Sequence, residues 1–501
     1  MKNKTGVCRA LLLVGMGLMI PCYLFTAGNT LLSPWPLYDR NRLALCLLTP
    51  LCLLLLLLLG RAAKAKVFET HERAVLLGFA AFYFVIQLVM ASALRFTPVT
   101  DLEQCVTAAR RLAQTGAFGD SERSLIYFGR YPHNMGLVYL LAGIFKAADA
   151  LGADELMAAA LVCGLLFSMG LLCAARLCCR LGGAQAQARA LLLFATCLPF
   201  LYCTSELYTD AFSVAFAPMI VFAFLKARDA GSRKERALWA LLFAVCTFFG
   251  AQIRFPTIIA AIACLIAALF EKRAKLTALL AAPLALVFAV GGSAVNTANK
   301  ANLGAANIAQ NKLPKLHYIA MGLPVQSDEG YGQYGYGGWL IFSTSFDDPQ
   351  ARDEALRQEV VDRAYTLAHH PAQLLSTLSR KNLSTFGRGT FNLNEIFEAD
   401  AHEADNAVKQ AVFENGRFNR AYTHLATAMF VAQMALACIA CIQAIRRRDT
   451  HAAPLFLTLL GAFLFLSIWE TRARYFFQFM MILLCAGAMF ETPSTHAAQK
   501  A

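Results

Sequence analysis

Long runs of apolar residues, separated by short polar stretches, dominate the chain. The run from Leu43 to Leu59 is almost entirely leucine, and similar runs recur at the length needed to cross a hydrocarbon core of about 30 Å. This pattern predicts an all-α polytopic membrane protein with about twelve transmembrane helices. We expect the spans at 7–26, 43–60, 74–94, 155–176, 187–205, 207–226, 236–252, 255–270, 275–293, 421–444, 453–470 and 474–490.

One further apolar run, from Met135 to Ala148, has only about fourteen residues. A run of this length suits a re-entrant or juxtamembrane helix in the outer leaflet better than a span. If it does not cross, the basic loops all share one side with the N-terminus, and the positive-inside rule makes that side cytoplasmic. These loops are 61–73, 176–189, 226–236, 272–275 and 446–448.

This orientation divides the chain into three parts. Residues 1–295 are expected to form a transmembrane domain whose first outer loop is 95–154, and residues 421–501 supply the C-terminal transmembrane helices. Residues 296–420 lie between them as an extracytoplasmic, mostly helical cap of about 125 residues. The outer face therefore carries the loop 95–154, the turn 206–210, the cap 296–420 and the turn 470–474.

Two features predict that the cap is folded. Residues 330–339 form an aromatic, glycine-rich loop, and residues 353–370 have the apolar spacing of an amphipathic helix that Pro371 ends. We expect a multi-pass protein of the cell membrane, with both termini cytoplasmic and its active face extracytoplasmic.

Composition agrees with this class and excludes others. Apolar residues make up 58% of the chain and charged residues 15%, which is typical of a membrane protein. The net charge of +13 lies mostly in short loops, so it indicates orientation in the bilayer, and nucleic acid is not an expected partner. Most of the 16 cysteines lie inside apolar runs, which argues against a disulfide framework or a zinc site. The sequence has no P-loop, nucleophile-elbow, HExxH or dinucleotide fingerprint.

Three carboxylates near the outer face are candidates for chemistry. Asp101 and Glu103 follow an apolar helix at the start of the first outer loop, where Asp101 could act as a catalytic base. The alternative is that Thr100 and Glu103 form a capping box at a helix start. Asp210 separates two apolar runs by only a few residues, and a carboxylate at this depth indicates function more than helix capping.

Arginines at the same face are candidates for binding phosphate. Arg254 lies between two spans, and Arg472 and Arg474 lie in the last outer turn. A guanidinium binds phosphate oxygens in a bidentate way, whereas a single interfacial arginine is also explained by snorkelling towards lipid headgroups. The occurrence of three arginines on the face of the carboxylates favours phosphate. Weaker candidates for substrate contact are Tyr131, His133, His317 and Lys381, each of which also has an ordinary structural explanation.

Taken in order along the chain, these residues resemble the GT-C superfamily of membrane glycosyltransferases, especially its bacterial protein-mannosyltransferase-like group. The resemblance runs from about Ala74 to Phe490. One departure is that Leu102 separates the two acidic residues of the first motif, which are often adjacent in that family. The matching elements are Asp101, Tyr131-Pro132, Tyr208-Thr209-Asp210, Arg254-x-Pro256-Thr257 and Glu470-x-Arg472-x-Arg474-Tyr475.

The resemblance implies an inverting glycosyltransferase with a polyprenyl-phosphate sugar as donor. A glycan or cell-wall polymer would be the acceptor, Asp101 and Asp210 would be catalytic, and Glu103 and the other candidates would bind substrate. A divalent cation at Asp101 and Asp210 could assist, although the sequence does not require any cofactor. The alternative function is a transporter or flippase of lipid-linked glycans, a class in which internal repeats and charges near the bilayer midplane are expected.

Overall fold

The computed structural model describes residues 2–35, 37, 41–63, 65–94, 97–119, 121–325, 329–393, 406–413 and 416–491. Within these ranges all regular secondary structure is helical. Eight segments are long and apolar enough to cross a membrane, which agrees with a polytopic membrane protein. They are α1–α2 over Gly6–Leu32, α3 (Arg42–Ala62), α4 (Ala65–Leu94), α8 (Glu155–Ala195), α9–α10 over Thr209–Asp229, α11 (Arg233–Ile253), α13 (Ala274–Leu303) and α20 (Asn419–Arg446).

Some of the expected spans take a different form. The spans expected at 155–176 and 187–205 are joined in α8, whose backbone is non-helical at Gly182 and Gly183, so the helix bends there. Beyond Ala195 the chain forms the short turns η2 (Leu198–Leu201) and η3 (Cys203–Ser205). The span expected at 207–226 is split into α9 (Thr209–Ser213) and α10 (Phe216–Asp229). The exact count of twelve spans therefore remains a prediction.

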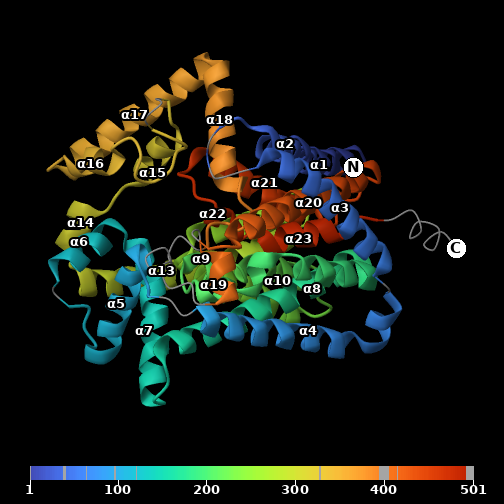
Figure 1. Ribbon diagram of the computed structural model, residues 1–501, viewed down its shortest axis with the longest axis horizontal. Helices are drawn as coiled ribbons and strands as arrows, with labels where there is room; N and C mark the ends of the chain where they lie inside the picture. Colours follow the sequence, from blue (N-terminus) through green and yellow to red (C-terminus); the bar gives the residue numbers. More distant parts are fainter. Residues whose placement is uncertain are drawn as a thin grey trace.

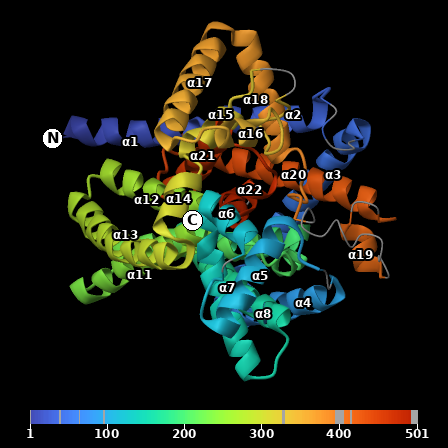
Figure 2. The same ribbon diagram turned by 90° about the vertical axis from the view of Figure 1, so that its left-hand side faces the viewer.

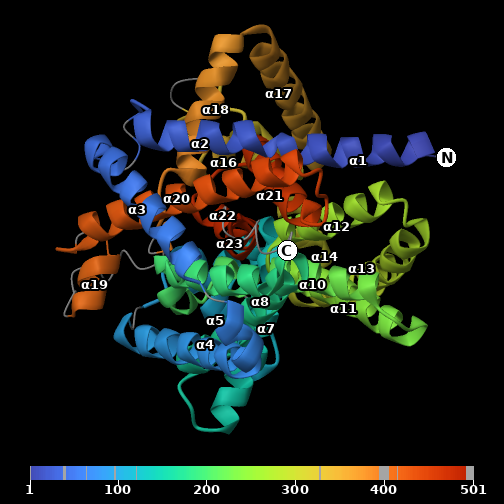
Figure 3. The same ribbon diagram turned by 90° about the vertical axis from the view of Figure 1, so that its right-hand side faces the viewer.

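The remaining apolar helices are short. α12 (Ile258–Phe270), which follows the turn η4 (Phe255–Thr257), and α21 (Ala453–Ile468) correspond to two expected spans. The last expected span becomes α22 (Arg474–Phe477) and α23 (Met480–Ala488), and every residue of α23 is buried. α8, α10 and α23 lie at the centre of the helical body in Figure 3, where their apolar side chains form the core.

The first outer loop is folded into helices α5 (Thr100–Thr115), α6 (Glu122–Arg130), η1 (Pro132–Asn134) and α7 (Met135–Ala150). α7 packs against α5 and α8 and runs across the direction of α4 in Figure 1. α7 is thus a short apolar helix, and its juxtamembrane place stays a prediction.

The described part of 296–420 is mostly helical, and it begins as a continuation of α13, which runs on to Leu303. Its place as an extracytoplasmic cap stays a prediction. Pro349–His369 forms α17, so the predicted helix is confirmed, and Asp348 caps it by accepting bonds from Gln350 and Ala351. Its amphipathic pattern is only partly present, because Leu356 and Leu367 are buried whereas Val361 and Tyr365 are exposed. α17 and α18 form a hairpin that stands off the helical body in Figures 1 and 2. The other cap helices are α14 (Ala305–Asn311), α15 (Lys315–Gly322), α16 (Trp339–Thr344), α18 (Pro371–Phe386) and α19 (Ala407–Val412).

The glycine-rich loop folds back onto the cap. Five of its glycines, between Gly330 and Gly338, have positive φ angles, which other residues rarely adopt. Its start is held by Glu329, which pairs with Arg363 of α17 at 2.5 Å and accepts a bond from the backbone of Val325. This loop brings Tyr334 towards the first outer loop, where Tyr334 and Tyr131 share a hydrogen bond of 2.8 Å between their hydroxyls.

Candidate active site

A cavity of about 1040 Å³ lies where the first outer loop, the end of α11, the cap and the turn after α21 meet. Figure 2 faces this side of the molecule, with α6, α14 and α22 near its centre. Seven of the ten predicted site residues line the cavity, although they come from widely separated parts of the chain. They are Asp101, Glu103, Tyr131, His133, Arg254, Arg472 and Arg474.

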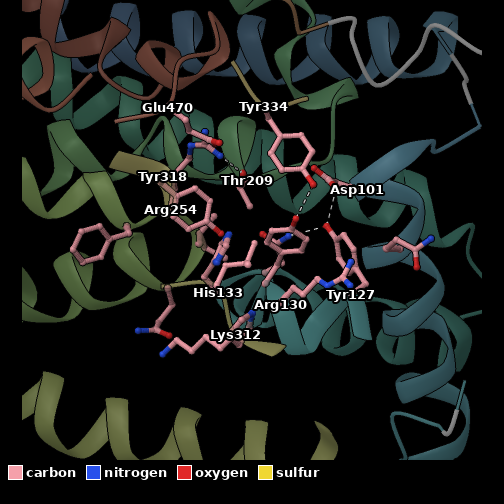
Figure 4. A pocket seen from close by; sticks show the side chains of 18 of the residues that line it. Asp101, Tyr127, Arg130, His133, Thr209, Arg254, Lys312, Tyr318, Tyr334 and Glu470 are labelled. Carbon is pink, nitrogen blue, oxygen red and sulfur yellow. Dashed lines mark hydrogen bonds between the residues drawn. The ribbon is translucent and has the colours of Figure 1, made fainter. Parts of the chain in front are cut away.

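Asp101 lies in the first turn of α5, half-buried, with its carboxylate towards the cavity. Its Oδ1 accepts a hydrogen bond of 2.8 Å from the hydroxyl of Tyr127, which in turn accepts one of 2.9 Å from Asn134 (Figure 4). The capping-box alternative is wrong, because α5 has Val99 at its N-cap and no side-chain capping bond. Asp101 is therefore held in place by side chains of the same outer loop.

Asp210 is completely buried in α9 and lies behind the cavity wall. Its carboxylate forms ion pairs with two arginines: Oδ1 is 3.0 Å from Nε of Arg254, and Oδ2 is 3.5 Å from Nε of Arg474. Thr209 also accepts a bond of 2.7 Å from Nη1 of Arg254. Asp210 therefore does not face the cavity itself but fixes two guanidinium groups that do.

Aromatic rings and a second carboxylate complete the arginine cluster. The guanidinium of Arg254 lies 4.3 Å from the ring centre of Tyr475, and that of Arg474 lies 5.4 Å from the ring of Tyr208. The hydroxyl of Tyr475 donates to Glu470, and burial raises the pKa of the Glu470 carboxyl against the charges of the nearby arginines. Because both guanidinium groups are held inside the protein by Asp210, snorkelling does not explain Arg254 or Arg474.

The wall next to the arginine cluster is aromatic. The ring of Tyr318 stacks on Trp469 with their centres 5.1 Å apart, and its edge contacts the imidazole of His133. His133 is exposed to the cavity. Desolvation by the surrounding protein and the charge of Arg254 lower the pKa of its imidazole to about 4. The ring is therefore neutral at neutral pH, so it can donate or accept a hydrogen bond but adds no charge.

Two predicted residues lie elsewhere. His317 is buried in the cap, where Nδ1 and the Ser343 hydroxyl are 2.7 Å apart. Lys381 of α18 is also buried and donates to the backbone oxygens of Gly322 and, at 2.7 Å, Trp469. These contacts hold α18 against the cap and the last outer turn. The predicted substrate contacts of His317 and Lys381 thus have no support in the geometry.

The structure adds lining residues that the sequence analysis did not select: Tyr127, Arg130, Lys312, Lys315 and Tyr334. Lys312 reaches the site because the backbone of Leu313 donates to the carbonyl of Arg130 at 3.3 Å, joining the cap to the first outer loop. One signal was available, since basic residues at the side predicted to be extracytoplasmic run against the positive-inside trend.

The predicted residues do not form a metal site. Among the described residues, no group of three or more His, Cys, Asp and Glu side chains could hold an ion. Asp101 is bonded to Tyr127, whereas both oxygens of Asp210 face arginines. The two carboxylates therefore do not fit a shared divalent cation.

Comparison with known proteins agrees with the membrane character of the fold. The family model described as "Conserved hypothetical integral membrane protein" matches residues 42–495. No curated protein and no solved structure matches the chain significantly. The matched range covers all the lining residues of the cavity.

Proposed function

The chain belongs to the family of conserved hypothetical integral membrane proteins, and we propose that it is a membrane glycosyltransferase. It would transfer a sugar from a polyprenyl-phosphate carrier to a cell-envelope acceptor at the outer face, with inversion. One observation carries the proposal: a carboxylate suited to be a base and guanidinium groups suited to bind phosphate line the same cavity. A base and a phosphate site are the two elements that such a reaction requires.

In this mechanism Asp101 accepts the proton of the acceptor hydroxyl as that oxygen attacks the anomeric carbon of the donor sugar. The bond from this carbon to the phosphate oxygen breaks at the same time, and polyprenyl phosphate leaves with the bonding electrons. The hydrogen bond from Tyr127 fixes one carboxylate oxygen of Asp101, which leaves the other oxygen for the proton.

Arg254 and Arg474 stabilise the leaving phosphate. A guanidinium has five N–H donors; Nη1 of Arg254 donates to Thr209, and its Nε is paired with the Asp210 carboxylate. Donors therefore remain for phosphate oxygens, and their orientation is fixed before the substrate binds. Fixed donors of this kind lower the barrier because they need no reorganisation when charge develops.

The test is sugar transfer by the purified protein from short-chain polyprenyl-phosphate sugars, measured as release of polyprenyl phosphate. We expect Asp101→Asn to fold normally and to lose activity by about two orders of magnitude or more, as for a general base. The matched control is Asp149→Asn, which neutralises an exposed carboxylate of α7 outside the cavity. Activity of Asp101→Asn within a few-fold of wild type would contradict the proposed base.

The same assay separates transfer from transport. A transporter or flippase would move the lipid-linked sugar between leaflets of a vesicle without releasing polyprenyl phosphate. Movement of the intact donor, with no cleavage for any sugar or acceptor tested, would replace the proposed function by the alternative.

A further inference from the structure

The cavity carries more positive charge than the donor phosphate requires. Seven arginine and lysine side chains line it, against three carboxylates. The three arginines near the donor phosphate, Arg254, Arg472 and Arg474, have Asp210 and Glu470 as their neighbours. With both carboxylates ionised, this group keeps one excess positive charge. A phosphodiester, such as the linkage in a polyprenyl-phosphate sugar, carries one negative charge, so this group alone can balance it.

A second cationic group lies on another side of the cavity and consists of Arg130, Lys312 and Lys315. In Figure 4 Glu470 lies at the upper side of the view, and Arg130 and Lys312 lie at the lower side. His133 lies between these two sides. Lys312 lines the cavity next to Arg130, because the backbone of Leu313 donates to the carbonyl of Arg130. Of these three cations, none forms an ion pair with a carboxylate of the described residues.

The surroundings of this group favour the binding of an anion. The ammonium of Lys315 lies 5.0 Å from the ring centre of Phe255, and Nε of Arg130 is buried without a hydrogen-bond partner among the described atoms. Cations that line a cavity with apolar walls raise the local concentration of anions, because the walls focus the field. The ordinary explanation, a solvated patch, does not account for the buried Nε of Arg130.

We propose that the acceptor is anionic and that Arg130, Lys312 and Lys315 bind its phosphate or carboxylate groups. The identification of the ligand as the acceptor rests on the proposed function, whereas the binding of an anion does not. Headgroup phosphates of the bilayer have the same chemistry, so the experiment must separate these two sources.

The experiment measures binding of three soluble oligomers to the protein in nanodiscs of phosphatidylcholine. The probes are oligo(glycerol phosphate), oligogalacturonate and a neutral N-acetylglucosamine oligomer of similar length. The test variant is Lys312→Gln with Lys315→Gln, and the control is Lys146→Gln with Lys300→Gln, two exposed lysines outside the cavity.

We expect the wild type to bind at least one anionic oligomer more tightly than the neutral one. The test variant should lose about tenfold or more in affinity, as for the loss of two charge-assisted contacts, and the control less than twofold. Equal binding of all three oligomers, no binding of either anionic one, or equal losses in both variants would overturn the proposal.

Nanodiscs of phosphatidylglycerol separate the two sources. If the lysines bind headgroups, the test variant unfolds at a lower temperature than wild type in these discs only, with oligomer binding unchanged, and the acceptor site is refuted. Failure of the proposed function would look different. Transfer would then be absent for every donor, while lysine-dependent binding of the anionic oligomers would persist.

Discussion

Asp210, Arg254 and Arg474 form a buried group of two ion pairs that share one carboxylate. Replacement of Asp210 by asparagine tests whether this carboxylate orients the two arginines. The substitution keeps the size of the side chain and removes the negative charge that is paired with both Arg254 and Arg474. Both guanidinium groups are nearly buried, with 14% and 13% of their side chains exposed. Removing one partner of a buried ion pair typically costs about 3–5 kcal/mol, since the remaining charge is left uncompensated.

We expect the cost of Asp210→Asn to lie at the lower end of this range. Arg254 keeps its bond to Thr209 and its contact with the ring of Tyr475, and Arg474 keeps its contact with Tyr208. Equilibrium unfolding in mixed micelles measures the free energy. A second variant, Arg474→Gln, completes a double-mutant cycle with Asp210→Asn, for which we expect a coupling energy of about 1–3 kcal/mol.

Stability and activity should separate in this cycle. The double variant should regain part of the stability lost in Asp210→Asn, because one of the uncompensated charges is gone. It should not regain transfer activity, because an arginine of the proposed phosphate site is missing. A coupling energy near zero, or a fully active Asp210→Asn protein, would refute the view that Asp210 orients the two arginines.

The remaining predictions concern other parts of the molecule. Arg254→Lys keeps the charge but loses the planar group of donors that contacts Asp210 and Thr209. The KM for the donor should rise by about tenfold or more, as measured from the transfer rate at increasing donor concentration. Burial lowers the pKa of Lys381 from 10.5 to about 7. Between about pH 7 and 10.5 the unfolded chain holds the proton that the folded protein has lost, so stability should rise with pH in this range. The gain from pH 7 to 9 should be about 2 kcal/mol in wild type and absent in Lys381→Met, measured by unfolding in micelles. An impermeant thiol reagent should label Ser345→Cys in the cap of intact cells but not Lys234→Cys in the loop before α11, and the reverse pattern would invert the predicted orientation.

The grouping of the site residues could be predicted because it depends on sidedness alone. Asp101 and Arg254 each lie next to the end of an apolar run, and loop charge assigns those ends to one face. Sharing one face makes a common cavity possible but does not require it, because His317 and Lys381 belong to the same predicted face and lie outside the cavity. The positions of single side chains within that face do not follow from this rule.

The cap shows why. His317 and Tyr318 are neighbours in α15, and successive residues of a helix point about 100° apart. Tyr318 therefore lines the cavity while His317 faces Ser343 in the cap interior. Which of the two faces the site depends on how α15 packs on α17, a contact between distant segments that no local pattern encodes. The same holds for Lys312, which reaches the cavity only because the cap folds over the first outer loop.

The hydropathy pattern does not give the helix ends where helices are short or bent. The run 187–205 is apolar enough to suggest a span, but Pro199 in η2 and the polar residues of η3 interrupt the helix. The turns that result carry the chain to Asp210, so the irregular backbone and the buried carboxylate occur together. In a membrane protein, backbone of this kind is tolerated where it is buried in protein or lines a cavity.

The distribution of charge favours a reaction at one face over movement through the membrane. The helices α12, α21 and α23 carry no charged residue, and α10 has charges only in its last turn. A transporter needs polar groups along a path across the bilayer, and such groups mark the pathway in known transport folds. Here the cations and carboxylates of the cavity lie at helix ends and in loops. Asp210 forms ion pairs with Arg254 and Arg474, which belong to two separate turns. Movement of these turns apart, as alternating access would require, would leave a completely buried carboxylate without its partners.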